Sequence, residues 1–152
     1  MQTLILQHED CLRHNPGSRH PESPARIEAV LGGLKGLRGL ERLPAPLATL
    51  EQITRVHPES FWSMLKDKEP TRGRVAIDPD TYISRGSIDA TLRGSGAICF
   101  AIDQVAGDKA RRAFCVVRPP GHHSESEQAM GFCLLNHVAV GARHALAAAG
   151  AG

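Results

Sequence analysis

The apolar residues of this chain gather in short runs, and some of these runs have the length and composition of strands. One continuous run, Ala-Phe-Cys-Val-Val at 113–117, is typical of a parallel strand covered on both faces. A shorter apolar segment at 3–6 predicts a first strand, and 75–77 predicts a short extended piece. The strands are few and are separated by long stretches with a different period.

Helical spacing begins in the first third of the chain. Apolar residues recur there at intervals of three and four, at Ile27, Val30, Leu31, Leu34 and Leu37. This spacing predicts an amphipathic helix. Ser23 and Pro24 precede it, and they match an N-cap residue followed by proline in the first helical position.

Three more helices are predicted further along. Thr49 and Gln52 have the spacing of a capping box and should open a short helix. Residues 58–65 predict the next helix. Ser87 is expected to cap a long helix that ends at about Ala106, and polar segments at 8–24, 66–74 and 78–87 are expected to be loops or exposed connections.

The last helix is predicted over 134–149. Its apolar residues fall on one side, at Leu135, Val138, Ala142 and Leu146. Gly150 stands where this helix would stop. A parallel strand followed by a helix requires another strand, reached by a right-handed crossover, and no later segment of the chain supplies one. We therefore expect an α/β fold, a mainly parallel sheet flanked by helices, that is incomplete in this chain.

Composition narrows the class of protein without identifying it. The chain has 41% hydrophobic and 22% charged residues, which is ordinary for one globular domain of 152 residues. A net charge of +2 and only 4% aromatic residues argue against a nucleic-acid partner. No apolar run has the length of a membrane span, and the N-terminus lacks the features of a signal peptide. A cytoplasmic protein with no membrane partner is expected.

Cysteine and histidine positions set limits on metal chemistry. The four cysteines form no Cys-x-x-Cys pair, which argues against a structural zinc knuckle, and Cys99 and Cys115 are expected to be buried thiols. Most of the eight histidines are expected on the surface or behind a site, namely His8, His14, His20, His57, His137 and His144.

The remaining two histidines stand in the most informative stretch of the chain. Arg118-Pro-Pro-Gly-His122-His123 follows the apolar run at 113–117, where a loop at the carboxyl edge of a sheet is a frequent place for an active site. The prolines and the glycine supply the irregular backbone that lets two neighbouring side chains face one cleft. Imidazole groups exchange protons near neutral pH, so the pair suits acid–base chemistry.

A second short string follows within ten residues. Gly131 would let backbone approach a ligand closely, and Phe132 offers a flat apolar wall. A histidine doublet alone is more often a surface feature than a catalytic pair, and a single phenylalanine is more often part of a core. The two strings together, in a strand–loop–helix setting, favour a functional site.

The whole stretch RPPGHHSESEQAMGFCLLNHVAVGARHAL resembles the central motif of the zinc-dependent histone deacetylase family. The resemblance is strongest to class II deacetylases, bacterial deacetylase-like amidohydrolases and acetylpolyamine amidohydrolases. His20-Pro-Glu-Ser-Pro-Ala-Arg-Ile, Val56-His57 and Asp78-Pro-Asp-Thr-Tyr resemble earlier segments of that family. The match covers essentially all of residues 1–152, but only the N-terminal portion of a single deacetylase-like domain, whose C-terminal remainder is absent.

The resemblance implies roles for particular residues. His122 matches the general base that acts on zinc-bound water, and His123 matches the neighbour that orients or protonates. Phe132 matches an aromatic wall of the acyl-lysine tunnel, and Gly131 matches a glycine whose carbonyl contacts the substrate amide.

Two further residues match the family at positions before this motif. Asp80 matches an aspartate at the rim that holds substrate backbone, although by itself it also fits a turn residue. Arg26 matches an arginine of an internal channel, although by itself it also fits a solvated helix residue.

The implied activity is zinc-dependent hydrolysis of an N-acetyl amide to free amine and acetate, and the implied partner is an acetyl-lysine protein or a small acetylated amine such as a polyamine. The family's zinc ligands and its carbonyl-polarising residue have no counterpart here, so zinc ligands are expected downstream and no metal site within the chain. Alone, the chain is expected to be inactive and to fold poorly. The alternative is a truncated, non-catalytic remnant that acts as a binding or regulatory module, and the downstream coding sequence distinguishes the two.

Overall fold

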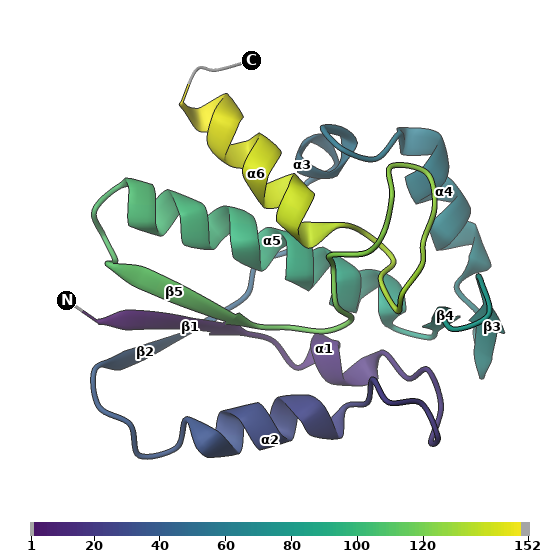
Figure 1. The fold of residues 1–152 in the computed structure, drawn as a ribbon, viewed down its shortest axis with the longest axis horizontal. Coiled ribbons are helices and arrows are strands. Elements are labelled where there is room, and N and C mark those ends of the chain that lie inside the picture. The colour runs from purple at the N-terminus through teal and green to yellow at the C-terminus, as the bar shows by residue number, and fades with distance from the viewer. Residues whose placement is uncertain (1, 150–152) are drawn as a thin grey trace.

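The computed structural model describes residues 2–149, and its centre is a three-stranded parallel sheet. The strands are β1 (Thr3–Gln7), β2 (Leu40–Pro44) and β5 (Arg112–Val116), and their order is β2-β1-β5. Leu4 and Leu6 of β1 are buried because this central strand is paired on both sides and covered on both faces. Helices lie on either side of the sheet (Figure 1).

Two long helices cover the opposite faces of this sheet. Helix α2 (Ala25–Gly33) packs on one face, where Ile5, Ile27 and Val116 form an apolar cluster. Helix α5 (Ser87–Ala106) packs on the other, where Leu6, Ala45, Ala97 and Ala101 meet. Helix α6 (His137–Ala148) lies against α5 on the side away from the sheet (Figure 1).

The other elements form a lobe beyond the carboxyl ends of β1 and β5. They are α1 (Asp10–Arg13), α3 (Leu50–Thr54), α4 (Glu59–Lys68), β3 (Arg74–Ala76) and β4 (Tyr82–Ser84). Strands β3 and β4 pair antiparallel as a small separate sheet. Phe61, Trp62, Ile83 and Leu134 belong to the apolar core of this lobe, so the loop after β5 is packed against it.

Close packing of α5 depends on its small residues. A Cβ on Gly96 would lie 2.2 Å from the Pro46 carbonyl oxygen, and one on Gly94 would lie 2.3 Å from the His137 ring. Both distances are too short for real atoms, so only glycine lets the helix approach its neighbours this closely.

Much of the expected architecture is confirmed. The parallel sheet flanked by helices, the strands at the N-terminus and near 113–117, and the helix over 87–106 are all present. The capping box is also present, because the Thr49 side chain accepts from the Gln52 N–H at 3.2 Å while the Gln52 side chain accepts from the Thr49 N–H at 3.0 Å.

Several local expectations were wrong. Strand β2 was missed because it has neither an apolar run nor a strict alternation, since only Leu40 and Leu43 are half-buried and the other residues are exposed. Helix α1 and strand β4 lie inside segments expected to be loops. Neither Ser23 nor Ser87 is an N-cap, since Pro24 and Gly86 hold those positions and no side chain caps either helix.

The expected burial of β5 and α6 was also wrong. Phe114 of β5 is 47% exposed, so one face of this strand is open rather than covered. Helix α6 begins at His137, after the expected start, because the Asn136 side chain accepts from the Ala139 N–H. The side expected to be buried is exposed, with Val138 57% and Leu146 45% accessible. Gly150 lies outside the described residues.

The expectation for the cysteines was partly wrong, because Cys99 is buried but Cys115 is only half-buried. His14, His57 and His137 are buried, which is consistent with the expectation that most histidines lie on the surface or behind a site. Burial raises the pKa of both Cys99 and Cys115 to about 11, so neither thiol ionises near neutral pH. Within residues 2–149, no helix is long and apolar enough to cross a membrane.

Candidate functional site

The candidate site lies where two loops leave neighbouring parallel strands. Residues 8–24 follow the carboxyl end of β1, and residues 117–136 follow the carboxyl end of β5. Because β1 and β5 are adjacent and parallel, these loops meet at one edge of the sheet, which is where ligands bind in open α/β folds. We call residues 118–136 the histidine loop.

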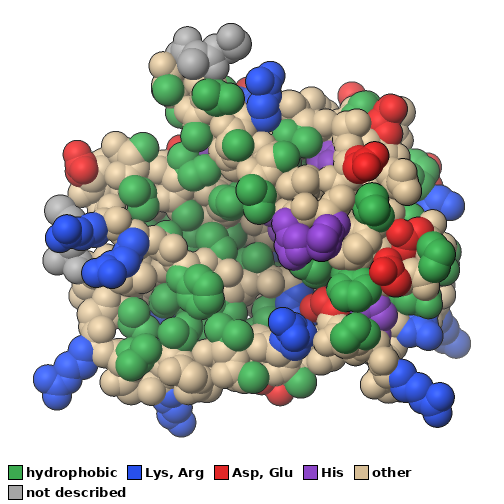
Figure 2. Space-filling view, in the orientation of Figure 1, with side chains coloured by type: hydrophobic (Ala, Val, Ile, Leu, Met, Phe, Trp, Pro, Cys, Tyr) green, Lys and Arg blue, Asp and Glu red, His purple; other side chains and the backbone are tan. Residues whose placement is uncertain are grey.

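A cleft of about 860 Å³ opens at this edge, and every residue expected to act at the site lines it. These residues come from separate parts of the chain and are Arg26, Asp80, His122, His123, Gly131 and Phe132. Figure 2 shows a large purple patch of histidine side chains on this face beside hydrophobic side chains, with smaller purple areas elsewhere. The structure therefore brings the candidate residues together, while their individual roles stay predictions.

The two histidines share the mouth of the cleft. Their ring centroids lie 4.3 Å apart with the ring planes tilted by 55°, and both side chains are exposed. The backbone N–H groups of His122 and His123 both point at the Cys133 sulfur, each at 3.4 Å. The buried Cys133 thiol in turn donates to the Gly131 carbonyl at 3.3 Å, so it ties the histidines to the next turn.

That turn is a tight reversal with an unusual backbone. Gly131 and Phe132 have φ values of 57° and 69°, and the backbone groups of Met130 and Cys133 bond to each other on either side. Two successive positive φ values at the centre of a two-residue reversal are the pattern of a type I′ turn. A Cβ on Gly131 would lie 2.7 Å from the His123 Cβ, so glycine is required next to the histidine.

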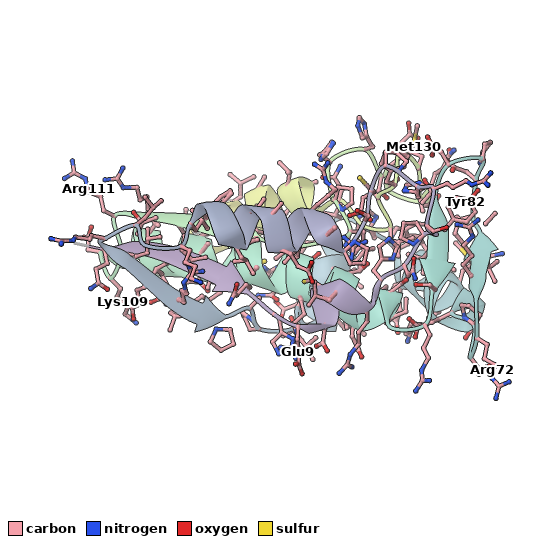
Figure 3. All side chains as sticks on the ribbon, turned by 90° about the horizontal axis from the view of Figure 1, so that it is seen from below. Glu9, Arg72, Tyr82, Lys109, Arg111 and Met130 are labelled. Carbon is pink, nitrogen blue, oxygen red and sulfur yellow. The ribbon has the colours of Figure 1, made fainter. Side chains whose placement is uncertain are left out.

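Asp80 forms the rim of the cleft on the side of the small sheet. The Asp78 carboxylate accepts from the Asp80 and Thr81 N–H groups at 2.9 and 2.7 Å, which shapes this loop. Hydrogen bonding to these groups lowers the pKa of Asp78 despite the opposing effect of burial. Figure 3 shows Tyr82 and Met130, which flank the rim and the turn, at the same end of the molecule.

A buried ion pair forms the floor of the cleft. The Arg118 guanidinium makes two hydrogen bonds to the Glu22 carboxylate and a third, at 2.7 Å, to the Cys11 carbonyl. Arg118 is 2% and Glu22 is 6% exposed, so each charge depends on the other for compensation. The pair joins the beginning of the histidine loop to the loop after β1.

His14 lies next to this ion pair. Its Nε2 is 3.5 Å from Glu22, and its Nδ1 is 2.7 Å from the Ser87 hydroxyl. Burial and the nearby Arg118 charge lower the pKa of His14 to about 3, so this ring is neutral at physiological pH.

Two more buried histidines support the histidine loop from behind. His137 lies between the Ser95 hydroxyl, at 2.8 Å from Nδ1, and the Pro119 carbonyl, at 3.3 Å from Nε2. Burial lowers the pKa of His137 to about 4. His57 accepts from the Asn136 N–H at 2.9 Å, and burial lowers its pKa as well. Both rings are neutral, and their hydrogen bonds to the backbone of the histidine loop hold it against the lobe.

The sequence reasoning did not single out Glu22, Thr81, Arg118 or these buried histidines as site residues. Glu22 and Arg118 lie inside recognised strings, but their separation of 96 positions gives no local sign that they pair. The available signal was a charged residue next to prolines, since Glu22 follows Pro21 and Arg118 precedes Pro119 and Pro120. Helical periodicity does not reveal His137, because the residue sits at the first turn of α6.

The described residues do not by themselves make a zinc site. Within 2–149 no group of three or more histidine, cysteine, aspartate or glutamate side chains converges as a metal cage. The pair His122 and His123 has no third ligand beside it, whereas zinc in proteins takes three or four.

Comparison with known proteins agrees with this fold. The histone deacetylase domain family model matches residues 20–151. A probable deacetylase of Archaeoglobus fulgidus is 35% identical over 92% of this chain and 40% of its own length. An uncharacterized protein of Synechocystis is 35% identical over 93% of this chain and 48% of its own length. The crystal structure of the HDA15 HD domain matches with a TM-score of 0.89 and 26% identity, over 97% of this chain and 44% of that one.

The chain belongs to the histone deacetylase family. It spans less than half the length of the relatives and of the solved domain just named. The shared part contains the histidine loop, the rim and the buried ion pair.

Proposed function

We propose that residues 1–152 form the N-terminal portion of a single deacetylase domain that hydrolyses N-acetyl amides to free amine and acetate. The observation that supports this is the convergence of six candidate residues, from three separate segments, on one cleft. Their chemical types suit the task, because two imidazoles, a carboxylate, an aromatic wall and a guanidinium surround a space large enough for an acylated side chain.

In this proposal His122 removes a proton from the attacking water and His123 orients it or returns a proton to the leaving amine. Both rings face solvent at the mouth of the cleft, 4.3 Å apart between centroids, which suits a shared proton-transfer task. Cys133 holds their backbone, so the loop that carries the two rings is fixed before substrate arrives.

The substrate is proposed to lie along Phe132, with the Gly131 carbonyl near its amide and Asp80 accepting from backbone N–H groups at the rim. Arg26 is exposed in this chain and lines the same cleft from α2, and in the completed domain it is proposed to line an internal channel. An acetyl-lysine protein or a small acetylated amine, such as an acetylated polyamine, fits this arrangement.

Zinc is the proposed cofactor, with its ligands outside residues 1–152. When bound, it would polarise the acetyl carbonyl and acidify a water molecule. The contribution of this chain is to supply the proton-transfer pair and the substrate wall. By itself the chain is therefore proposed to be inactive, and its proposed location is the cytoplasm.

A second candidate is a truncated protein that binds or regulates without catalysis. The open face of β5 supports it, because an exposed apolar strand can accept a partner. The coding sequence directly downstream distinguishes the two: a continuation with zinc-ligand motifs favours the enzyme, and a native stop after Gly152 favours the remnant.

The activity test uses a completed domain, defined as residues 1–152 followed by the C-terminal half of a deacetylase domain. That half is the protein's own continuation or, failing that, the corresponding half of the Synechocystis relative. We expect zinc-dependent release of acetate from an acetyl-lysine peptide or an acetylated polyamine. Activity that persists after the metal is removed by chelation and dialysis would contradict the proposal.

A further inference from the structure

Thr81 stands out because it is fully buried between the exposed Asp80 and the half-buried Phe132 and bonds to both. Its hydroxyl accepts from the Phe132 N–H at 2.9 Å and donates to the Asp80 carboxylate at 3.1 Å. One side chain therefore links the rim of the cleft to its aromatic wall, which lie 52 positions apart in sequence at residues 80 and 132.

The bond to Phe132 acts on a strained backbone. Phe132 has a φ of 69°, a region that side chains with a Cβ rarely adopt. In the tight turn from Met130 to Cys133, the two backbone bonds join only the end residues, so the Phe132 N–H is left for another acceptor. Thr81 supplies that acceptor and so helps to hold the aromatic ring in its direction.

His20 makes a second connection between the same two groups. The Glu22 N–H donates to Nδ1 of His20 at 3.1 Å, which leaves Nε2 to donate to the Asp80 carbonyl at 2.9 Å. The His20 ring also meets the Phe132 ring edge-on, with centroids 4.5 Å apart. Rim and wall are thus joined beneath by Thr81 and outside by His20.

We propose that Thr81 is a positioning residue that couples Asp80 to Phe132, so that the rim and the wall of the cleft hold one fixed geometry. This inference rests on the proposed function, in which Asp80 binds substrate backbone and Phe132 flanks the acyl chain. A substrate that uses both contacts at once gains from the coupling. An acetylated peptide has backbone N–H groups for Asp80 and is therefore more dependent on Thr81 than a small acetylated amine.

The kinetic test compares Thr81→Val, Thr81→Ser and Thr91→Val in the completed domain. Thr91 is the matched control, because it is also fully buried and its hydroxyl has no hydrogen-bond partner among the described residues. For an acetyl-lysine peptide, Thr81→Val should raise KM roughly 3- to 10-fold, as for one lost hydrogen bond, and change kcat by less than about 2-fold. Thr81→Ser should restore KM, and Thr91→Val should leave it unchanged.

The size of the substrate sharpens the test. With an acetylated polyamine, Thr81→Val should raise KM less than with the peptide, by a factor of at least about 2. An unchanged peptide KM in Thr81→Val, or a loss that Thr81→Ser does not reverse, would overturn the proposal. An equal rise in KM with both substrates would show that Thr81 does not act through Asp80, and would contradict that part of the proposal.

Amide hydrogen exchange tests the coupling without any activity. The Phe132 N–H should exchange roughly 3- to 10-fold faster in Thr81→Val than in the parent domain, with Thr81→Ser and Thr91→Val close to the parent. Should the completed domain prove inactive, the proposed function fails while this measurement still decides the coupling. An unchanged exchange rate of the Phe132 N–H in a folded Thr81→Val protein would refute the coupling. If Thr81→Val does not fold, an exchange rate in Thr81→Ala equal to that of the parent would refute it instead.

Discussion

The histidine loop and the regular elements that precede and follow it, β5 and α6, are stabilised in opposite ways. Residues 118–136 contain no helix or strand. They are nevertheless held at several points by the bonds of Arg118, of the Cys133 thiol and of the Ser124 hydroxyl. Strand β5 and helix α6 are regular, yet they expose Phe114, Val138 and Leu146. A regular backbone and a fully packed set of side chains are therefore separate properties in this chain.

Buried polar groups follow the same division. Among the described residues, the buried side-chain atoms without a hydrogen-bond partner are Gln7 Oε1 and Thr91 Oγ1, and neither lies in the histidine loop. In contrast, β5 has one strand neighbour only, so one of its edges is unpaired within the described sheet. The loop therefore has its buried polar groups satisfied, whereas the edge presents backbone groups to which another strand could pair.

Breaking the ion pair beneath the loop should have the largest effect. Arg118→Ala would leave the Glu22 charge buried without its partner and should lower the free energy of unfolding by about 3–5 kcal/mol. Urea denaturation of the completed domain measures this. Arg112→Ala, which removes an exposed arginine at the start of β5, is the control and should change stability by less than about 0.5 kcal/mol. A loss below about 1 kcal/mol for Arg118→Ala would contradict the assigned role of the pair.

Acid should weaken the loop through its buried histidines. The pKa values of His14 and His137 are lowered to about 3 and about 4 in the folded protein. The unfolded chain therefore binds more protons below about pH 6.5, and stability must fall as the pH drops from there towards 4. Each ring contributes on the order of 3 kcal/mol to this fall.

Denaturant midpoints measured between pH 7 and pH 4 test this dependence. The variant His137→Gln should flatten the curve by roughly one proton, because a neutral amide replaces the titrating ring. A parent protein whose stability is constant over that range would show that the buried rings do not control it.

Removing the exposed imidazole should impair chemistry while leaving the fold intact. In the completed domain His122→Ala should lower kcat by roughly 10²-fold or more with little change in KM, as for a lost general base. His123→Ala should also lower kcat, whereas Phe132→Ala should mainly raise KM. The control is Gln128→Ala, an exposed side chain of the same loop. Near-normal turnover in His122→Ala would rule out its proton-transfer role.

Substitutions at the exposed apolar residues of β5 and α6 should have the smallest effect on stability and a measurable effect on solubility. Residues 1–152 alone are expected to aggregate or to show weak amide protection, because an apolar strand edge and helix face are open. Val138→Lys should raise the soluble fraction and change stability by less than about 0.5 kcal/mol, since this side chain is 57% exposed.

The buried neighbour of this residue provides the contrast. Val140→Ala should cost about 1 kcal/mol or more, because Val140 is 0% exposed. Sedimentation and thermal melting measure both properties. A soluble parent chain with a sharp cooperative melt would show that the open edge needs no cover.

The local pattern of residues was sufficient to predict the elements that are specified by an apolar run, a cap or helical spacing. The apolar run at 113–117, the capping box at Thr49 and the long helix of α5 could all be predicted, because each is specified by neighbours in sequence. The candidate cleft residues were predicted through their motifs, which is a resemblance and not a result of periodicity.

Tertiary structure alone decided the rest. Strand β2 exists because its backbone pairs with β1, which the order of its own side chains does not reveal. Glu22 and Arg118 can be buried because parallel neighbouring strands bring their loops to the same edge, and the Thr81 hydroxyl meets Phe132 for a similar reason. Contacts between distant segments depend on how the strands are ordered, and a one-dimensional pattern of apolar residues reports which segments are apolar but not what covers them.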